Sequence, residues 1–366
     1  MSCDLINMAT PGVRGLQPYH PGKPIEELER ELGINNIIKL ASNENALGPS
    51  PRVLEALPTI RELYRYPDGN GFALKQVLSE FHSVRPDQIT LGNGSNDILE
   101  FAARVFLFPG MNSIFSEHAF AIYPIATQAV GAQGLVVPAK NFSHDLDAMH
   151  TAINDGTRLI FIANPNNPTG TCLGETELRQ FLEKVPERII VLLDEAYYEY
   201  ARGGDYPDSV SWLDDFSNLI ITRTFSKAYG LAGLRVGYSV SSVEMANLLN
   251  RVRQPFNVNS IAMRLAGIAV SDQQYIQDVV KFNHRGLQQL MEGLDSMGIH
   301  FIPSRANFLC IDMEQDAKPV YDKLLHEGVI VRPVEGYGLP QHLRVTIGLP
   351  EENERFLTTL AKVLSE

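Results

Sequence analysis

Residues 218–240 read NLIITRTFSKAYGLAGLRVGYSV, two apolar runs joined by a more polar turn. Both runs have the length of a strand and are nearly continuous in apolar residues, which is typical of a sheet covered on both faces. Similar runs occur at 158–165 and 188–196, and helical patterns such as 175–185 lie between some of them. This alternation predicts an α/β fold with a large, mixed and mostly parallel sheet.

The pattern changes along the chain and predicts three parts. Residues 1–35 carry many Pro and Gly and little periodicity, so we expect an N-terminal arm with one short helix at 24–32. Residues 36–258 are expected to form the large α/β domain. Long helical patterns, short strands and a final helix then predict a smaller α+β domain over 259–366.

Composition excludes several classes of function. The net charge of the 366-residue chain is −12 and no Lys/Arg block occurs, which argues against nucleic-acid and membrane-surface binding. Cys3, Cys172 and Cys310 form neither a CxxC pair nor a metal-ligand spacing, so we expect reduced thiols, a cytoplasmic protein and no metal site. We expect no signal peptide and no membrane-spanning segment, because the start lacks the signal pattern and the apolar runs are short.

Chemically useful side chains follow three of the apolar runs. In covered sheets of this kind, ligands bind beyond the carboxyl ends of the strands. The side chains found there are Asn164, Asn166 and Asn167, then Asp194 and Tyr197, and then Thr224, Ser226 and Lys227. Each set alone has an ordinary explanation, as a turn, a helix cap or a solvated lysine. Together they place an amine, a carboxylate, an amide, a phenol and hydroxyls at one edge.

That set of groups matches one cofactor. An amine can form a Schiff base with an aldehyde, and a carboxylate can hold a protonated ring nitrogen. Hydroxyls and the nearby Arg235 can hold a phosphate, as can the helix start predicted at GNGSND, residues 92–97. An aldehyde, a basic ring nitrogen and a phosphate are the three groups through which proteins bind pyridoxal 5′-phosphate. The small residues around Lys227 are then expected to leave room for the ring and phosphate of this cofactor.

A series of segments resembles a known family in their order: NENALGPSP, RYPD, GNGSND, NPNNPTG, DEAYYEY, TFSKAYGLAGLRVG and LRVTIG. They are similar to the fold-type I, aspartate-aminotransferase-like enzymes, and the resemblance runs from about residue 15 to the end. Among these, the chain looks most like the members that move an amino group between histidinol phosphate and 2-oxoglutarate. Aromatic aminotransferases and threonine-phosphate decarboxylases share most of these motifs and stay open as alternatives, as does a cofactor-binding regulator without turnover.

The resemblance implies a role for each cofactor contact. Lys227 is the lysine that carries the cofactor and later acts as the base, and Asp194 pairs with the pyridine nitrogen. Asn167 and Tyr197 contact the oxygen on the ring. Phe120, where many members have tyrosine, stacks on the ring. The phosphate ligands implied are Ser95, Asn96, Thr224, Ser226 and Arg235.

The resemblance also implies a homodimer and a substrate site. Tyr66 of RYPD would reach the cofactor phosphate of a neighbouring subunit, so the two active sites would be shared. Arg344 would bind the distal anion of the substrate, and Arg332 on a nearby predicted strand is a second candidate, although it could equally be an exposed strand residue. The remaining substrate contacts implied are Tyr19, Asn43 and Asn167.

Overall fold

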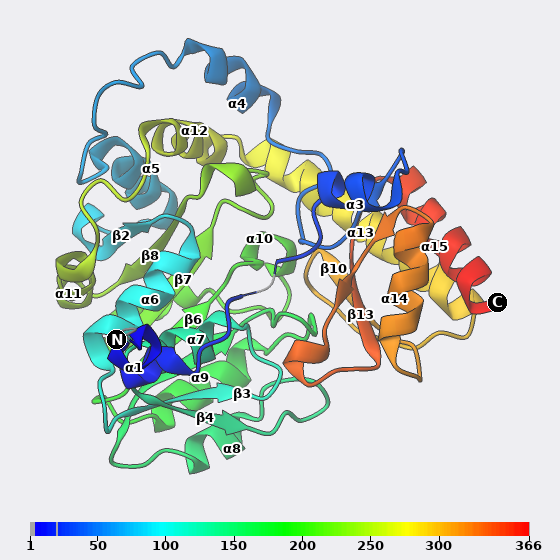
Figure 1. Cartoon of the computed structure of the whole chain (residues 1–366). Coiled ribbons are helices and arrows are strands. Elements are labelled where there is room, and N and C mark those ends of the chain that lie inside the picture. Colours follow the sequence, from blue (N-terminus) through cyan, green and yellow to red (C-terminus); the bar gives the residue numbers. More distant parts are fainter. Residues whose placement is uncertain (1–3, 20, 366) are drawn as a thin grey trace.

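The computed structural model describes residues 4–19 and 21–365, and its largest sheet has seven strands (Figure 1). In spatial order they are β2 (Ile89–Gly92), β8 (Gly237–Ser241), β7 (Leu219–Thr224), β6 (Ile190–Asp194), β5 (Thr157–Ala163), β3 (Asn112–Ser116) and β4 (Gln133–Val137). Strand β8 pairs antiparallel with both of its neighbours, and the pairs from β7 to β4 are parallel. The predicted mixed and mostly parallel sheet is confirmed.

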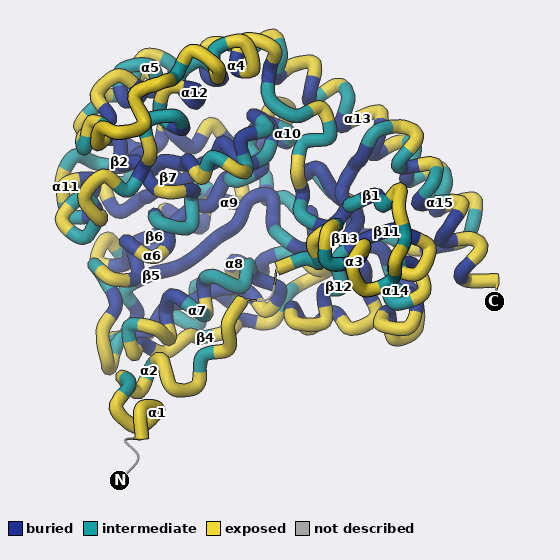
Figure 2. Tube along the Cα trace, turned by 45° about the horizontal axis from the view of Figure 1, so that its top comes forward, coloured by how far each residue is buried: buried dark blue, intermediate teal, exposed yellow. Residues whose placement is uncertain are grey.

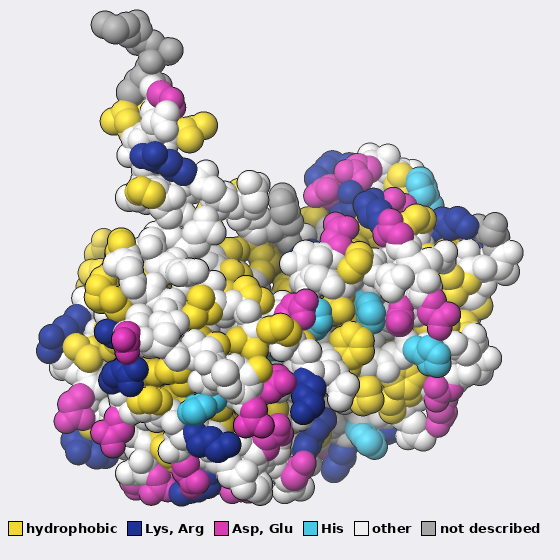
Figure 3. Space-filling view, turned by 90° about the horizontal axis from the view of Figure 1, so that it is seen from below, with side chains coloured by type: hydrophobic (Ala, Val, Ile, Leu, Met, Phe, Trp, Pro, Cys, Tyr) yellow, Lys and Arg dark blue, Asp and Glu magenta, His cyan; other side chains and the backbone are white. Residues whose placement is uncertain are grey.

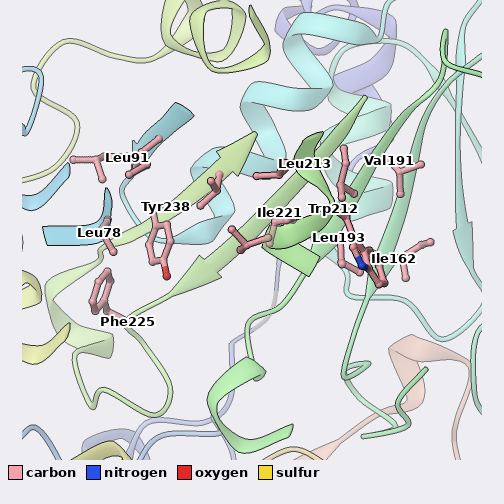
Figure 4. Close-up of a cluster of buried hydrophobic side chains, with 14 of the residues drawn as sticks. Leu78, Leu91, Ile162, Val191, Leu193, Trp212, Leu213, Ile221, Phe225 and Tyr238 are labelled. Atoms are coloured by element: carbon pink, nitrogen blue, oxygen red, sulfur yellow. The ribbon is translucent and has the colours of Figure 1, made fainter. Parts of the chain in front are cut away.

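Both faces of this sheet are buried at its central strands β5, β6 and β7, which explains the continuous apolar runs there. Successive residues alternate between two apolar clusters: Leu192 and Ile220 belong to one, and Leu193 and Ile221 to the other. Figure 4 shows the second cluster, where the labelled Trp212 and Phe225 join the strand residues. Figure 2 shows the strands as a buried layer beneath more exposed helices.

Helices supply the covering layers. The first cluster draws on α6 (Ser95–Phe106), α7 (Ile122–Ala129) and α11 (Val243–Val252). The second draws on α4 (Pro51–Ala56), α5 (Phe72–His82), α8 (Leu146–Thr151), α9 (Glu175–Lys184) and α12 (Ser260–Ser271). Because α12 contributes to the core of the large sheet, the chain just after residue 258 still packs there. The domain boundaries given above stay a prediction.

A second, antiparallel sheet has its own core, beside the first sheet (Figure 1). Its strands are β12 (Arg332–Pro333), β13 (His342–Thr346), β10 (Phe308–Asp312) and β9 (Phe301–Ile302). The helices around it are α13 (Gln273–Ser296), α14 (Ala317–His326) and α15 (Pro350–Ser365). A short parallel pair, β1 (Ile38–Lys39) with β11 (Val329–Ile330), joins the early chain to this part. No helix among residues 4–19 and 21–365 is long and apolar enough to cross a bilayer.

The N-terminal segment holds more helix than the sequence analysis expected. The helix expected at 24–32 occurs as α3 (Ile25–Leu32), but α1 (Leu5–Met8) and α2 (Pro11–Arg14) precede it. The side chain of Asp4 caps α1 and proline begins α2, local signals that periodicity over four residues cannot reveal. Figure 3 shows this end of the chain projecting from the body with apolar side chains on its surface.

Candidate active site

A cavity of about 300 Å³ lies at the carboxyl ends of β5, β6 and β7 and is also lined by β12 and β13. Most site residues singled out in the sequence line it; Asn164, Asn166 and Tyr66 do not. Those that do are Tyr19, Asn43, Ser95, Asn96, Phe120, Asn167, Asp194, Tyr197, Thr224, Ser226, Lys227, Arg235, Arg332 and Arg344. Segments separated by more than 300 residues therefore meet in one cavity, in which the large sheet supplies one wall and the small sheet the other.

Asp194 ends β6 with only one of its two carboxylate oxygens engaged. Its Oδ2 accepts a hydrogen bond of 2.9 Å from the hydroxyl of Tyr123, whereas its Oδ1 is buried and has no hydrogen-bond partner. Burial raises the pKa of Asp194 to about 6. Leaving a buried carboxylate oxygen without a donor is costly, so this geometry suits a ligand that brings a cationic N–H.

Lys227 presents a weakly basic amine to the same cavity. Its Nζ donates to the carbonyl oxygen of Ser42 at 3.0 Å and lies 5.7 Å from the ring centre of Tyr197. Burial is the main reason why its pKa falls to about 7, and the positive charges of Arg344 and Arg235 lower it further. Near neutral pH, a substantial share of this amine is therefore unprotonated and nucleophilic.

The small residues around Lys227 divide into two groups: Ser226 lines the cavity, whereas two of those that follow Lys227 are small for another reason. Ala228 and Gly230 do not line the cavity. Ala228 is fully buried in the core, and a Cβ on Gly230 would collide with the backbone of Gly48. Gly230 also has φ of +69°, which favours glycine. At Ala228 and Gly230, small size therefore serves packing within the protein.

The N-terminus of α6 and a guanidinium form one end of the cavity. Ser95 begins the helix after Gly94, whose φ is +83°. Arg235 lies so close to Gly94 that a Cβ there would collide with Nη2. Its Nη1 donates to the hydroxyl of Ser226 at 3.1 Å. A positive helix end, an arginine and a hydroxyl group together make an anion site.

The other end of the cavity carries Arg332 and Arg344, which are paired directly across β12 and β13. Like charges in that position destabilise a sheet unless an anion offsets them. Arg344 donates to Oδ1 of Asn167 at 2.5 Å and to the carbonyl of Ala41 at 2.8 Å, and makes no ion pair with a carboxylate of the described residues. The guanidinium of Arg332 lies 5.8 Å from the ring centre of Tyr19.

The remaining polar residues divide between ligand-facing and structural roles. Asn43 donates to the hydroxyl of Tyr197 at 2.8 Å, and burial raises the pKa of Tyr197 to about 12, which keeps this phenol protonated. Asn164 and Asn166 bond within their own turn and to the backbone of neighbouring loops. Of the three asparagines after β5, Asn167 lines the cavity, and the other two hold its loop.

Tyr66 and Tyr123 fall outside the simple strand-end pattern. Tyr66 does not line the cavity of its own chain; it is 83% exposed and stacks on Phe256 with ring centres 4.8 Å apart. Tyr123 is the residue that the sequence analysis missed. It lies on the apolar face of α7, where a tyrosine is indistinguishable from an ordinary core residue until its hydroxyl is seen on Asp194.

The lowered pKa of Lys227 generates a test. In the protein without ligand, the rate at which an amine-acylating reagent modifies Lys227 should be half-maximal near pH 7 and level off above it, because a lowered pKa leaves the neutral amine abundant at lower pH. Arg344→Ala should move the half-maximum to higher pH, since Arg344 is the strongest charge that depresses this pKa. The exposed Arg104 is not in the cavity, so Arg104→Ala is the matched control. A half-maximum above about pH 9 in the parent protein would contradict this environment.

Comparisons with known proteins agree with this geometry. The family model for class I and II aminotransferases matches residues 35–360. The chain is 59% identical to histidinol-phosphate aminotransferase 2 of Pseudomonas fluorescens Pf-5 over the full length of both. It is 55% identical to histidinol-phosphate aminotransferase 1 of Nitrosococcus oceani, covering 98% of this chain and 97% of that one. The crystal structure of histidinol-phosphate aminotransferase from Sinorhizobium meliloti, in complex with pyridoxal 5′-phosphate, has a TM-score of 0.91 and 28% identity and covers 97% of each chain. The chain belongs to the class I and II aminotransferase family.

Proposed function

We propose that the chain is a pyridoxal 5′-phosphate-dependent aminotransferase of histidine biosynthesis. It exchanges an amino group between L-histidinol phosphate and 2-oxoglutarate, giving imidazole acetol phosphate and L-glutamate. The observation that carries this proposal is the pair Arg332 and Arg344, facing each other in a cavity that also holds Lys227 and Asp194. Relatives over the full length carry the name histidinol-phosphate aminotransferase, which supports the same substrate.

The cavity fits the aldehyde, the ring nitrogen and the phosphate of the cofactor. The unpartnered Oδ1 of Asp194 would accept the proton of the ring nitrogen, which removes the cost of leaving that oxygen bare. The α6 N-terminus with Arg235, Thr224 and Ser226 would hold the phosphate. Lys227, which lines the same cavity, would bind the aldehyde carbon. Phe120 would cover the ring.

The chemistry divides between the cofactor and the side chains. When bound, the cofactor supplies a ring that takes up the electron pair left when the substrate loses the proton next to its nitrogen. Lys227 would hold the cofactor and, once released by the amine of the substrate, would serve as the base that moves this proton. Asp194 would keep the ring nitrogen protonated. Burial keeps Tyr197 protonated at neutral pH, so its hydroxyl would be available as a donor to the ring oxygen.

The substrate would lie with its phosphate between Arg332 and Arg344. A phosphate dianion accepts directional, charge-assisted bonds from two guanidinium groups, whereas the carboxylate of an aromatic amino acid calls for one. It would also offset the repulsion of two arginines held opposite each other. Tyr19 and Asn43 would line the rest of the substrate path.

The proposal predicts a strong preference for the phosphorylated substrate. The parent protein, supplied with pyridoxal 5′-phosphate and 2-oxoglutarate, should turn over histidinol phosphate far better than histidinol or phenylalanine. Arg344→Ala and Arg332→Ala should each lower kcat/KM for histidinol phosphate roughly ten- to a hundredfold, since a charge-assisted bond contributes about 1.5–3 kcal/mol. Steady-state kinetics of glutamate formation measure both effects, with Arg104→Ala as the control.

Two results would count against this assignment. Equal turnover of histidinol and its phosphate would remove phosphate recognition and favour an aromatic substrate. Release of carbon dioxide from threonine phosphate, without need for 2-oxoglutarate, would instead favour the decarboxylase alternative. The solved threonine-phosphate decarboxylase from Porphyromonas gingivalis is 21% identical to this chain and shares the fold alone.

We also propose that the enzyme works as a cytoplasmic homodimer with shared active sites. Large apolar side chains are exposed in the segment from α4 to the start of α5: Leu54, Leu57, Leu63, Tyr64, Tyr66 and Phe72. A concentration of this kind is typical of an interface. A second copy of the chain is the occupant that we infer, because Tyr66 lies outside its own cavity and could contribute to that of a partner.

Mixing variants tests whether the sites are shared. Tyr66→Ala and Lys227→Ala homodimers should each have low activity. In an equal mixture after subunit exchange, each mixed dimer would carry both substitutions in one site and none in the other. Because only the mixed dimers contain an intact site, the activity of the whole mixture should rise to about one quarter of the parent level. Activity that stays at the average of the two unmixed variants, although mixed dimers form, would show that Tyr66 serves no partner site.

A further inference from the structure

A buried ion pair lies on the side of the sheet opposite the cavity. The side chain of Glu195 is 0% exposed and that of Arg223 is 2% exposed. Nε of Arg223 donates to Oε2 of Glu195 at 2.9 Å, and Nη2 lies 2.8 Å from the same oxygen. The other oxygen of Glu195 accepts a hydrogen bond of 2.7 Å from Ser209. The guanidinium of Arg223 also lies over the ring of Tyr198, 3.4 Å from its centre.

The position of the pair in the chain links it to the site. Glu195 follows Asp194 at the end of β6, and Arg223 precedes Thr224 at the end of β7. The strands are neighbours, and the backbone N–H of Glu195 donates to the carbonyl of Thr222 at 2.9 Å. Successive strand residues point to opposite faces, so the residues beside the ion pair point into the cavity. Asp194 and Thr224 both line it.

We propose that Glu195 and Arg223 are positioning residues that set the distance between the ring-nitrogen partner and the phosphate site. The inference rests on the proposed cofactor. One rigid molecule must meet Asp194 from β6 and Thr224, Ser226 and Lys227 from the end of β7 at the same time. The ion pair joins those two strand ends on the side away from the cavity. A shift of either strand end would move Asp194 relative to the residues that would hold the phosphate.

The choice of an ion pair supports this role over stability alone. Exchanging a buried ion pair for apolar side chains of similar volume is often neutral or stabilising, so stability alone does not account for this one. A guanidinium held by a carboxylate and by a tyrosine ring has a fixed direction and distance, which apolar packing does not impose. The negative charge of Glu195, one residue from Asp194, contributes to raising the pKa of that carboxyl, while Arg223 compensates Glu195 itself.

The chain offers a matched control at the other end of the same strands. The side chain of Asn218, just before β7, donates to the carbonyl of Ile189, just before β6, at 2.7 Å. Asn218 is buried and lies far from the cavity lining. Asn218→Ala therefore loosens the same strand pair without touching the end that forms the site. It separates a general loss of stability from a loss of alignment.

The test compares pyridoxal 5′-phosphate, which would contact both Asp194 and the phosphate site, with inorganic phosphate, which would occupy the phosphate site alone. For the apoprotein of each variant, we would measure the Kd of pyridoxal 5′-phosphate, the Ki of inorganic phosphate as its competitor, and Tm. Glu195→Gln should raise the Kd of pyridoxal 5′-phosphate about tenfold and leave the Ki of phosphate unchanged. Asn218→Ala should lower Tm and leave both constants at the parent values.

A second variant keeps the test decisive if Glu195→Gln does not fold. Glu195→Asp retains the charge but is one methylene shorter. It should therefore also raise the Kd of pyridoxal 5′-phosphate and leave the Ki of phosphate unchanged. Unchanged cofactor affinity in the Glu195 variants, or an equal loss in Asn218→Ala, would overturn the inference. Cofactor binding without transamination by the parent would instead refute the proposed function, and the affinity comparison would still decide the role of the pair.

Discussion

The architecture of the site depends on the carboxylate of Asp194, which the fold buries at the end of β6. One oxygen is satisfied by Tyr123 and the other by nothing in the described chain. A buried carboxylate oxygen without a donor opposes folding, and a ligand that supplies the missing donor would remove that cost. The same burial that makes the oxygen costly in the absence of a ligand makes its bond to a ring N–H strong in its presence.

Positive charge is concentrated around that single carboxylate, although the chain as a whole has a net charge of −12. Arg235 and the α6 N-terminus lie at one end of the cavity and Arg332 with Arg344 at the other. This division suits two separate anions, the phosphate of a cofactor and that of a substrate. It also lowers the pKa of Lys227, which lies within reach of both groups of charges.

Much of the fold and site followed from strand patterns. Apolar runs predicted the sheet, and because parallel strands end at one edge, Asp194, Asn167 and Lys227 could be expected to meet. The resemblance to known enzymes added Tyr19, Asn43 and the other residues from distant segments. Periodicity could not reveal that Arg332 and Arg344 lie directly opposite each other, since this depends on the strand register.

Other features had no clear signal in the sequence. The contact of Tyr123 with Asp194 depends on where one hydroxyl on an apolar helix face points. The bond from Lys227 to Ser42 uses a backbone carbonyl, which any residue carries. The small residues near Lys227 invited an explanation by ligand size, whereas Gly230 is required by its positive φ and by the backbone of Gly48.

The most direct test of the account observes the ring nitrogen itself. The protein would be reconstituted with pyridoxal 5′-phosphate carrying ¹⁵N in the ring, and the ¹⁵N chemical shift measured for the parent and for Asp194→Asn near neutral pH. We expect a protonated ring nitrogen in the parent and an unprotonated one in the variant, because the carboxylate of Asp194 holds that proton in place. An unprotonated nitrogen in the parent, or the same shift in both proteins, would contradict it.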